Sequence, residues 1–198
     1  MLGSTERLRR PGRFPAQVRR LVLYAPLFGE RNELWRARIG APGDPSVISP
    51  EIGCYRLISR DDIRKRWDAD IGSDDPDRLR DPEMPDAVFE ALAGLDPMTG
   101  TRSPPAFRSP AGALADLIRI FNGKPLYDPA QITMPTLLVR GSDDTTSTDA
   151  DSKNLLRSIA AAAKDYQVIT PGSHFLCVER NRQELYDRIA AFFERPIP

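Results

Sequence analysis

A carboxylate and an imidazole follow two neighbouring apolar segments near the end of this 198-residue chain. Asp144 comes just after the run Pro135–Gly141, and His174 comes just after the run Tyr166–Thr170. If both runs are parallel strands, both residues emerge at the carboxyl edge of the sheet, where open α/β sheets place their sites. A carboxylate beside an imidazole fixes its tautomer and stabilises the imidazolium, as in a nucleophile–base–acid triad. We therefore predict that His174 and Asp144 are catalytic residues.

Each of these residues also has a structural interpretation. Asp144 lies within 142–151, which is rich in Asp, Ser and Thr, so it is also a candidate for capping a turn or a helix. A histidine in a Gly-Ser-His-Phe loop, taken alone, is more often a packing or surface residue. The position of His174 after a strand, together with its acid partner, favours the catalytic interpretation.

Three nucleophilic side chains lie near the pair. Ser142 and Ser173 are its sequence neighbours, but neither lies on the sharp strand-to-helix turn that exposes a nucleophilic serine. Cys177 follows the histidine by three residues, and its neighbours Phe175, Leu176 and Val178 indicate a buried structural thiol. We expect none of the three to be the nucleophile.

The middle of the chain holds weaker candidates for contact with a substrate. Trp35, Tyr55 and Trp67 either line an apolar acyl pocket or pack within this region, and packing is the preferred interpretation. Arg108 lies in a proline-rich turn, where it either meets an anionic substrate group or is a surface arginine. The surface interpretation is preferred for this residue.

Short apolar runs and amphipathic segments predict the elements that position the pair. Leu21–Ala25 resembles the two runs above and is typical of a strand buried on both faces. Asp149–Lys164 has helical spacing, with Asp149 or Asp151 as its cap, and a last amphipathic helix spans Asn181–Glu194. Alternating strands and helices predict an α/β fold with about three parallel strands and flanking helices.

Between the first two strands, Phe28–Tyr127 is rich in proline and glycine and shows no sustained strand pattern. Helical pieces are expected at Ser59–Trp67, Asp86–Leu95 and Gly112–Phe121. We interpret this region as a helical insertion rather than a separate domain. The predicted organisation is residues 1–27 as the first core strand, 28–128 as the insertion, and 129–198 as the remaining core with the acid and the histidine.

Composition excludes several classes of function. The chain has 28 basic and 28 acidic residues, so it lacks the positive charge that drives binding to nucleic acid or anionic membranes. No apolar run approaches the roughly 18 residues of a membrane span. Two cysteines indicate a reducing, cytoplasmic location, and a single histidine excludes a multi-histidine metal site. For the basic first twenty residues, a solvated helix and turn is preferred over an organellar transit peptide.

The two ends of the chain resemble the C-terminal half of α/β-hydrolase-fold proteins of the lysophospholipase and esterase type. The segments that carry the resemblance are Val18–Pro26, Ile132–Asp144, Gly172–Glu179 and the final helix through Phe193. The resemblance implies that the intervening residues are the family's variable cap. It also implies that His174 is the base and Asp144 the acid, with Asp143 as the alternative. The implied substrate is a small molecule with an ester-like or amide-like bond, and the implied reaction needs no cofactor.

The family's nucleophile lies in a Gly-x-Ser-x-Gly elbow, and no such pentapeptide occurs in the 198 residues. Counting back from Val18 along the family pattern places the elbow at or before Met1. We therefore expect the elbow and the oxyanion loop to lie upstream, the chain to be a fragment, and the fragment to be inactive alone. The strand Leu21–Ala25 would then expose an edge that favours self-association.

Two alternatives remain open. One is a non-catalytic binding or interaction module on the same scaffold. The other is a dehalogenase-like relative with an aspartate nucleophile. The residue at the upstream elbow discriminates among the three hypotheses. Serine there indicates ester hydrolysis, aspartate indicates dehalogenation, and the absence of both indicates a binding role.

Overall fold

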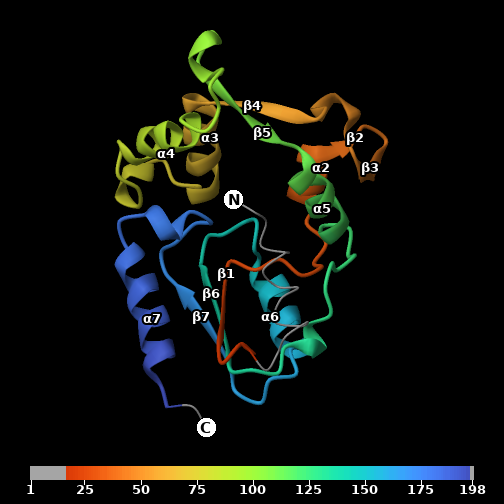
Figure 1. The fold of residues 1–198 in the computed structure, drawn as a ribbon, viewed down its shortest axis with the longest axis vertical. Helices are drawn as coiled ribbons and strands as arrows, with labels where there is room; N and C mark the ends of the chain where they lie inside the picture. Colours follow the sequence, from red (N-terminus) through yellow and green to blue (C-terminus); the bar gives the residue numbers. More distant parts are fainter. Residues whose placement is uncertain (1–16, 197–198) are drawn as a thin grey trace.

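Three parallel strands form the sheet that the sequence predicts (Figure 1). The computed structural model describes residues 17–196. Its sheet has the order β1-β6-β7 and consists of β1 (Leu21–Tyr24), β6 (Thr136–Gly141) and β7 (Lys164–Ile169). Leu21 pairs with Thr136, and Thr136 pairs with Lys164, so the carboxyl ends of the strands meet at one edge. The predicted N-terminal helix and turn lie mostly in residues 1–16, outside the described part of the chain.

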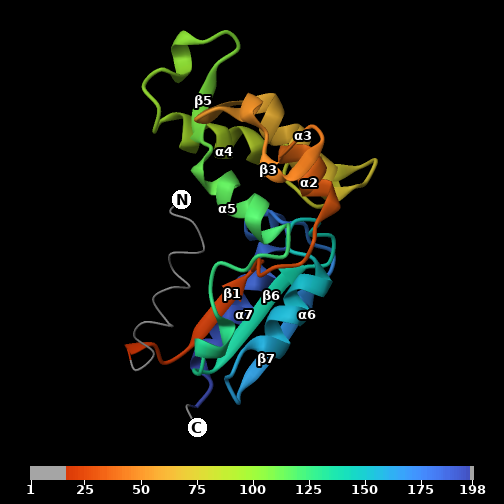
Figure 2. The same cartoon turned by 90° about the vertical axis from the view of Figure 1, so that its right-hand side faces the viewer.

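Helices cover both faces of this sheet (Figure 2). They are α6 (Asp149–Ser158) and α7 (Arg182–Glu194). Leu138 of β6 lies in one apolar core with Leu155 of α6, whereas Leu137 lies in a second core with Leu185 of α7. Because side chains alternate along a strand, β6 fills both cores and is buried along its whole length.

The helix after β6 differs from the prediction in two respects. It ends at Ser158, because Ile159 adopts an extended backbone conformation and Lys164 already begins β7. The residue that caps its start is Thr148, whose side chain accepts a hydrogen bond from Asp151 N, so neither predicted aspartate is the cap. The predicted last helix is confirmed as α7.

Residues 28–128, hereafter the intervening segment, connect β1 to β6 and contain strands as well as helices (Figure 1). The helices are α2 (Glu33–Ile39), α3 (Arg60–Ile71), α4 (Met84–Ala93) and α5 (Gly112–Ile120). Two antiparallel pairs join β2 (Gly40–Ala41) to β3 (Asp44–Ile48) and β4 (Tyr55–Ser59) to β5 (Ala106–Pro110). The three predicted helices correspond to α3, α4 and α5.

The insertion contains the predicted helices and, in addition, two short antiparallel strand pairs that the sequence pattern does not predict. The strands β4 and β5 are far apart in the sequence, so no local turn signal announces their pairing. Strand β3 begins with Asp44 and Pro45 and is almost fully exposed, which removes the alternating apolar pattern of a strand. Helix α2 is also absent from the prediction, although Asn32 caps it by accepting a hydrogen bond from Trp35 N.

The intervening segment is tied to the core at its first residues. The buried carboxylate of Asp151 on α6 accepts hydrogen bonds from the backbone amides of Phe28, Gly29 and Glu30, at 2.9, 2.9 and 2.8 Å. These bonds fix the direction in which the chain leaves β1. Within residues 17–196, no helix is long and apolar enough to cross a membrane.

Candidate active site

The loops after β6 and β7 touch at two glycines. A Cβ atom added to Gly141 would lie 2.2 Å from the carbonyl oxygen of Gly172, so only glycine fits at this approach. The next residue but one, Asp143, donates its backbone N–H to the same carbonyl at 2.7 Å. This contact brings together the two loops that carry Asp144 and His174.

The structure places the side chains of these two residues against each other. His174 Nδ1 lies 2.9 Å from Asp144 Oδ2. The other oxygen, Asp144 Oδ1, accepts the backbone N–H groups of Thr146 and Ser147, both at 2.8 Å. The carboxylate of Asp144 is fully buried, and its hydrogen bonds leave it one orientation.

A buried arginine donates hydrogen bonds to two backbone carbonyl groups of the acid loop. Arg140, at the end of β6, donates from Nε to the carbonyl of Ser147 at 2.6 Å and from a terminal nitrogen to the carbonyl of Asp144 at 2.7 Å. A buried guanidinium requires such acceptors, because an unpaired one would be costly to remove from water. The loop that presents Asp144 is therefore held on both its amide and its carbonyl groups.

The imidazole of His174 has one engaged and one available nitrogen. Because a carboxylate accepts from Nδ1, the proton of the neutral ring is assigned to that nitrogen, and Nε2 carries the lone pair. The side chain of His174 is 32% exposed, and no residue between 17 and 196 hydrogen-bonds to Nε2. This geometry suits a general base that takes a proton at Nε2 while Asp144 stabilises the imidazolium.

Helix α3 of the intervening segment reaches both loops through one carboxylate. Asp70, whose side chain is fully buried, accepts the backbone N–H of His174 at 2.6 Å and the hydroxyl of Thr145 at 2.5 Å. Its Oδ1 also lies 3.2 Å from a guanidinium nitrogen of Arg66. Asp70 thus joins the acid loop, the histidine loop and α3.

A second buried carboxylate, Glu179, organises the residues around the histidine. It accepts the Ser173 backbone N–H at 3.1 Å, the Ser173 hydroxyl, and the indole N–H of Trp67 at 3.0 Å. Burial raises the pKa of Glu179, and these hydrogen bonds partly oppose the rise. Ser173 is fully buried and its hydroxyl is bonded to the Glu179 carboxylate, so this serine has a structural role.

The structure also gives the other two nucleophile candidates, Ser142 and Cys177, features that disfavour a role as nucleophile. Ser142 donates its hydroxyl to Asp143 Oδ1 at 3.1 Å. Asp143, the alternative acid, accepts from Gly172 N at 3.3 Å with its other oxygen, and His174 pairs with Asp144 instead. Burial raises the pKa of the Cys177 thiol, which disfavours the reactive thiolate.

The aromatic and arginine candidates pack rather than line an open pocket. Trp35 is buried beside Phe121, with ring centroids 5.7 Å apart, and Trp67 is fully buried. Tyr55 is half exposed on β4. Arg108 forms hydrogen bonds with Asp96 that hold the pKa of this carboxyl well below its usual range. Its guanidinium group therefore forms a contact within the intervening segment.

Sequence reasoning did not identify Asp70 as a site residue, although a signal for it exists. Ile63, Trp67 and Asp70 share one face of α3, and all three are buried. A carboxylate on an otherwise apolar helix face needs a buried partner, which here is the histidine loop.

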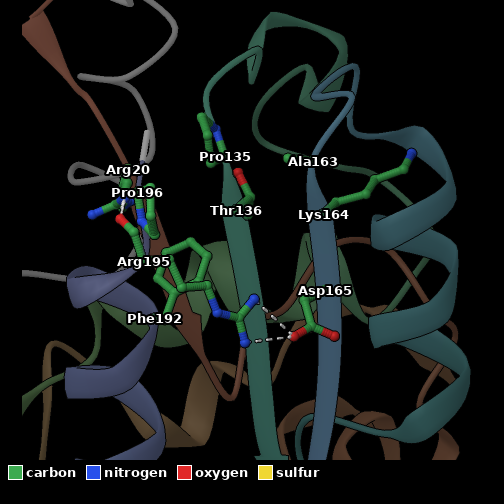
Figure 3. Close-up of a pocket in the computed structure, with 9 residues that line it drawn as sticks. All are labelled: Arg20, Pro135, Thr136, Ala163, Lys164, Asp165, Phe192, Arg195 and Pro196. Atoms are coloured by element: carbon green, nitrogen blue, oxygen red, sulfur yellow. Dashed lines mark hydrogen bonds and ion pairs between the residues drawn. The ribbon is translucent and has the colours of Figure 1, made fainter. Parts of the chain in front are cut away.

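Other parts of the described chain offer no competing site of comparable chemistry. In residues 17–196, no group of three or more His, Cys, Asp or Glu is arranged to hold a metal ion. A cavity of about 280 Å³ lies beside Thr136 and Lys164, at the amino ends of β6 and β7 (Figure 3). This is the end of the sheet opposite to Asp144, and the cavity's Arg195 and Asp165 pair with each other at 3.4 Å.

The comparisons with known proteins place this geometry in a known fold. No family model matches the chain, and no curated protein matches it. Many solved structures are similar to the chain, among them the following three. The putative non-heme bromoperoxidase BpoC from Mycobacterium tuberculosis H37Rv has a TM-score of 0.51 and 14% identity, covering 96% of this chain and 63% of that one. The Paleococcus ferrophilus monoacylglycerol lipase has a TM-score of 0.50 and 14% identity, covering 97% and 64%.

The third is the enol-lactonase from Burkholderia xenovorans LB400, with a TM-score of 0.50 and 16% identity, covering 95% of this chain and 61% of that one. The chain therefore spans less than two thirds of the length of each of these three proteins. At such identities the similarity is one of fold alone, and the three proteins have the same fold. The chain has the α/β-hydrolase fold, as the resemblance in its sequence implies.

Proposed function

We propose that this chain carries the acid and the base of a serine hydrolase that cleaves an ester-like or amide-like bond of a small molecule. His174 takes the proton of an attacking serine at Nε2 and returns it to the leaving group, while Asp144 orients the ring through Nδ1. The observation that supports this most is the 2.9 Å contact between His174 Nδ1 and the buried Asp144 carboxylate at the carboxyl ends of two strands.

In this proposal the nucleophile comes from a segment that precedes Met1 in the full gene product. Of the residues that the structure describes, 17–27 and 129–196 belong to the hydrolase core in this proposal, and residues 28–128 act as a cap. The nucleophile and the oxyanion donors supply much of the catalytic power, so we expect the 198-residue chain to turn over no ester by itself.

The first test uses the chain as it is. Purified protein is assayed with p-nitrophenyl acetate, beside the His174→Ala variant. Equal background rates are expected from both proteins. Turnover that His174→Ala abolishes would refute an upstream nucleophile and would assign the activity to residues of this chain.

The second test uses the in-frame DNA upstream of Met1. We expect it to encode Gly-x-Ser-x-Gly, and we expect the extended protein to hydrolyse p-nitrophenyl acetate. Asp144→Asn and His174→Ala should each lower kcat by about 10³-fold or more, whereas Asp143→Asn should change it little. An aspartate at the elbow would instead support dehalogenation. The absence of both serine and aspartate there would support a binding module.

A further inference from the structure

A group of arginines lies next to the acid loop and has no role in the hydrolase chemistry described above. Arg38 of α2 and Arg66 of α3 both place their guanidinium carbon 5.2 Å from the ring centre of Trp35. Phe121 is stacked on the same indole at 5.7 Å with an interplanar angle of 22°, so one face of the ring is occupied. Both guanidinium groups therefore lie close to the Trp35 ring.

This pair is connected to the catalytic acid through a single residue. Thr146 Oγ1 accepts from Arg66 at 2.8 Å and from the indole N–H of Trp35 at 3.0 Å. The backbone N–H of Thr146 donates to Asp144 Oδ1. Arg66 also lies 5.4 Å from the ring centre of Phe175, the residue after the histidine. The positive group thus borders both catalytic loops.

The charges in this group are incompletely balanced. Arg66 is paired with Asp70, but neither Arg38 nor Arg56 forms an ion pair in the part of the chain that the structure describes. Burial and the charge of Arg66 lower the pKa of Arg38, and burial and the charge of Arg38 lower the pKa of Arg56. The carboxylates that partly offset these charges are Asp70 and Asp62.

Guanidinium groups suit the binding of an anion, because their planar donors match the oxygens of carboxylate and phosphate.

We propose that Arg38 and Arg66 bind an anionic oxygen group of the substrate, a carboxylate or a phosphate. The proposal rests on the proposed function, because it defines the substrate of the same site as an ester or amide that carries a negative charge. Trp35 supports the two guanidinium groups, and Thr146 fixes their position relative to Asp144.

Binding is measured on the 198-residue chain without any hydrolysis. The protein is titrated with succinate and, separately, with inorganic phosphate, and the two indole N–H resonances are followed by ¹H–¹⁵N NMR. The resonance of Trp35 should shift saturably with at least one of the anions, and the shift should weaken as sodium chloride is added. Trp67, whose indole N–H is bonded to Glu179, is the internal control.

Arg38→Gln is the test variant, because Arg38 is exposed and its removal leaves the contacts of Trp35 with Thr146 in place. Arg119→Gln, an exposed arginine on α5, is the matched control. Arg38→Gln should weaken binding about fivefold or more, and the control should leave it unchanged. The anion that binds identifies carboxylate or phosphate as the preferred group.

No saturable shift with either anion, or equal weakening by both variants, would overturn the proposal. Neither probe contains a bond that the enzyme hydrolyses, so this result is independent of the nucleophile. Binding without turnover by the extended protein would refute only the hydrolase function. Turnover of p-nitrophenyl acetate without anion binding would refute only the arginine site.

Discussion

Replacing Asp70 by alanine removes the contact through which α3 holds the histidine loop. The fully buried carboxylate accepts the His174 backbone N–H at 2.6 Å and faces Arg66 at 3.2 Å. Loss of the acceptor leaves a part-buried amide unsatisfied, which costs about 1–3 kcal/mol. Arg66 is 22% exposed and keeps its bond to Thr146, so loss of its ion pair contributes only about 1 kcal/mol. We expect Asp70→Ala to lower the free energy of unfolding by about 2–4 kcal/mol.

The assay is urea denaturation followed by circular dichroism, with hydrogen exchange of the His174 amide as a local readout. Asp61→Ala, an exposed aspartate in the first turn of the same helix, is the control and should cost about 0.3–1 kcal/mol. The His174 amide should exchange faster in Asp70→Ala by more than the loss of global stability explains. Asp70→Asn keeps one acceptor oxygen, so its loss of unfolding free energy should lie between those of Asp61→Ala and Asp70→Ala.

Two results would contradict this reasoning. One is a loss below about 1 kcal/mol for Asp70→Ala, which would show that the contact is dispensable. The other is unchanged exchange of the His174 amide despite a large loss of stability. In that case α3 would stabilise the fold without positioning the histidine loop.

Three further predictions concern the same core. Because burial raises the pKa of Glu179, its contribution to stability is present below the ordinary value of 4.5 and is lost as the pH rises through the raised folded value. Glu179→Gln should therefore gain less stability on acidification through that range, as measured by urea unfolding at several pH values. Gly141→Ala should lose at least about 2 kcal/mol in thermal or urea unfolding, because its Cβ would overlap a backbone carbonyl, whereas Gly112→Ala has open space and should be nearly neutral. The amides of Leu21 and Ala25 donate toward β6, so that of Val22 points to the open edge, and we expect Val22→Pro to reduce any concentration-dependent self-association seen in sedimentation velocity.

The Asp144–His174 pair was accessible to sequence reasoning because each residue follows a local signal. A continuous apolar run predicts each buried strand, and parallel strands bring their carboxyl ends together whatever lies between them. The pairing of β6 with β7 therefore required no knowledge of the 28–128 region. The length of α6 was less accessible, because Ile159 and the alanines after it fit a helix as well as the irregular connection they form.

The contacts of α3 could not be predicted in the same way. Asp70 and His174 are 104 positions apart, and hydrophobic periodicity reports that a helix face is buried without reporting what covers it. The same limit applies to β4 and β5, whose register pairs Tyr55 with Pro110. Such partners depend on the tertiary arrangement, which a local pattern does not contain.

The intervening segment does more than cover the end of the sheet, because three of its side chains bond to the loops that carry Asp144 and His174 or to residues beside them. Asp70 binds the backbone of His174, Trp67 binds Glu179, and Trp35 binds Thr146. The two tryptophan bonds are buried and the Asp70 bond is part-buried, so the loss of each leaves a polar group with little access to water unsatisfied. We therefore expect changes at exposed residues of the segment to leave the Asp144–His174 geometry intact, and changes at these three positions to disturb it.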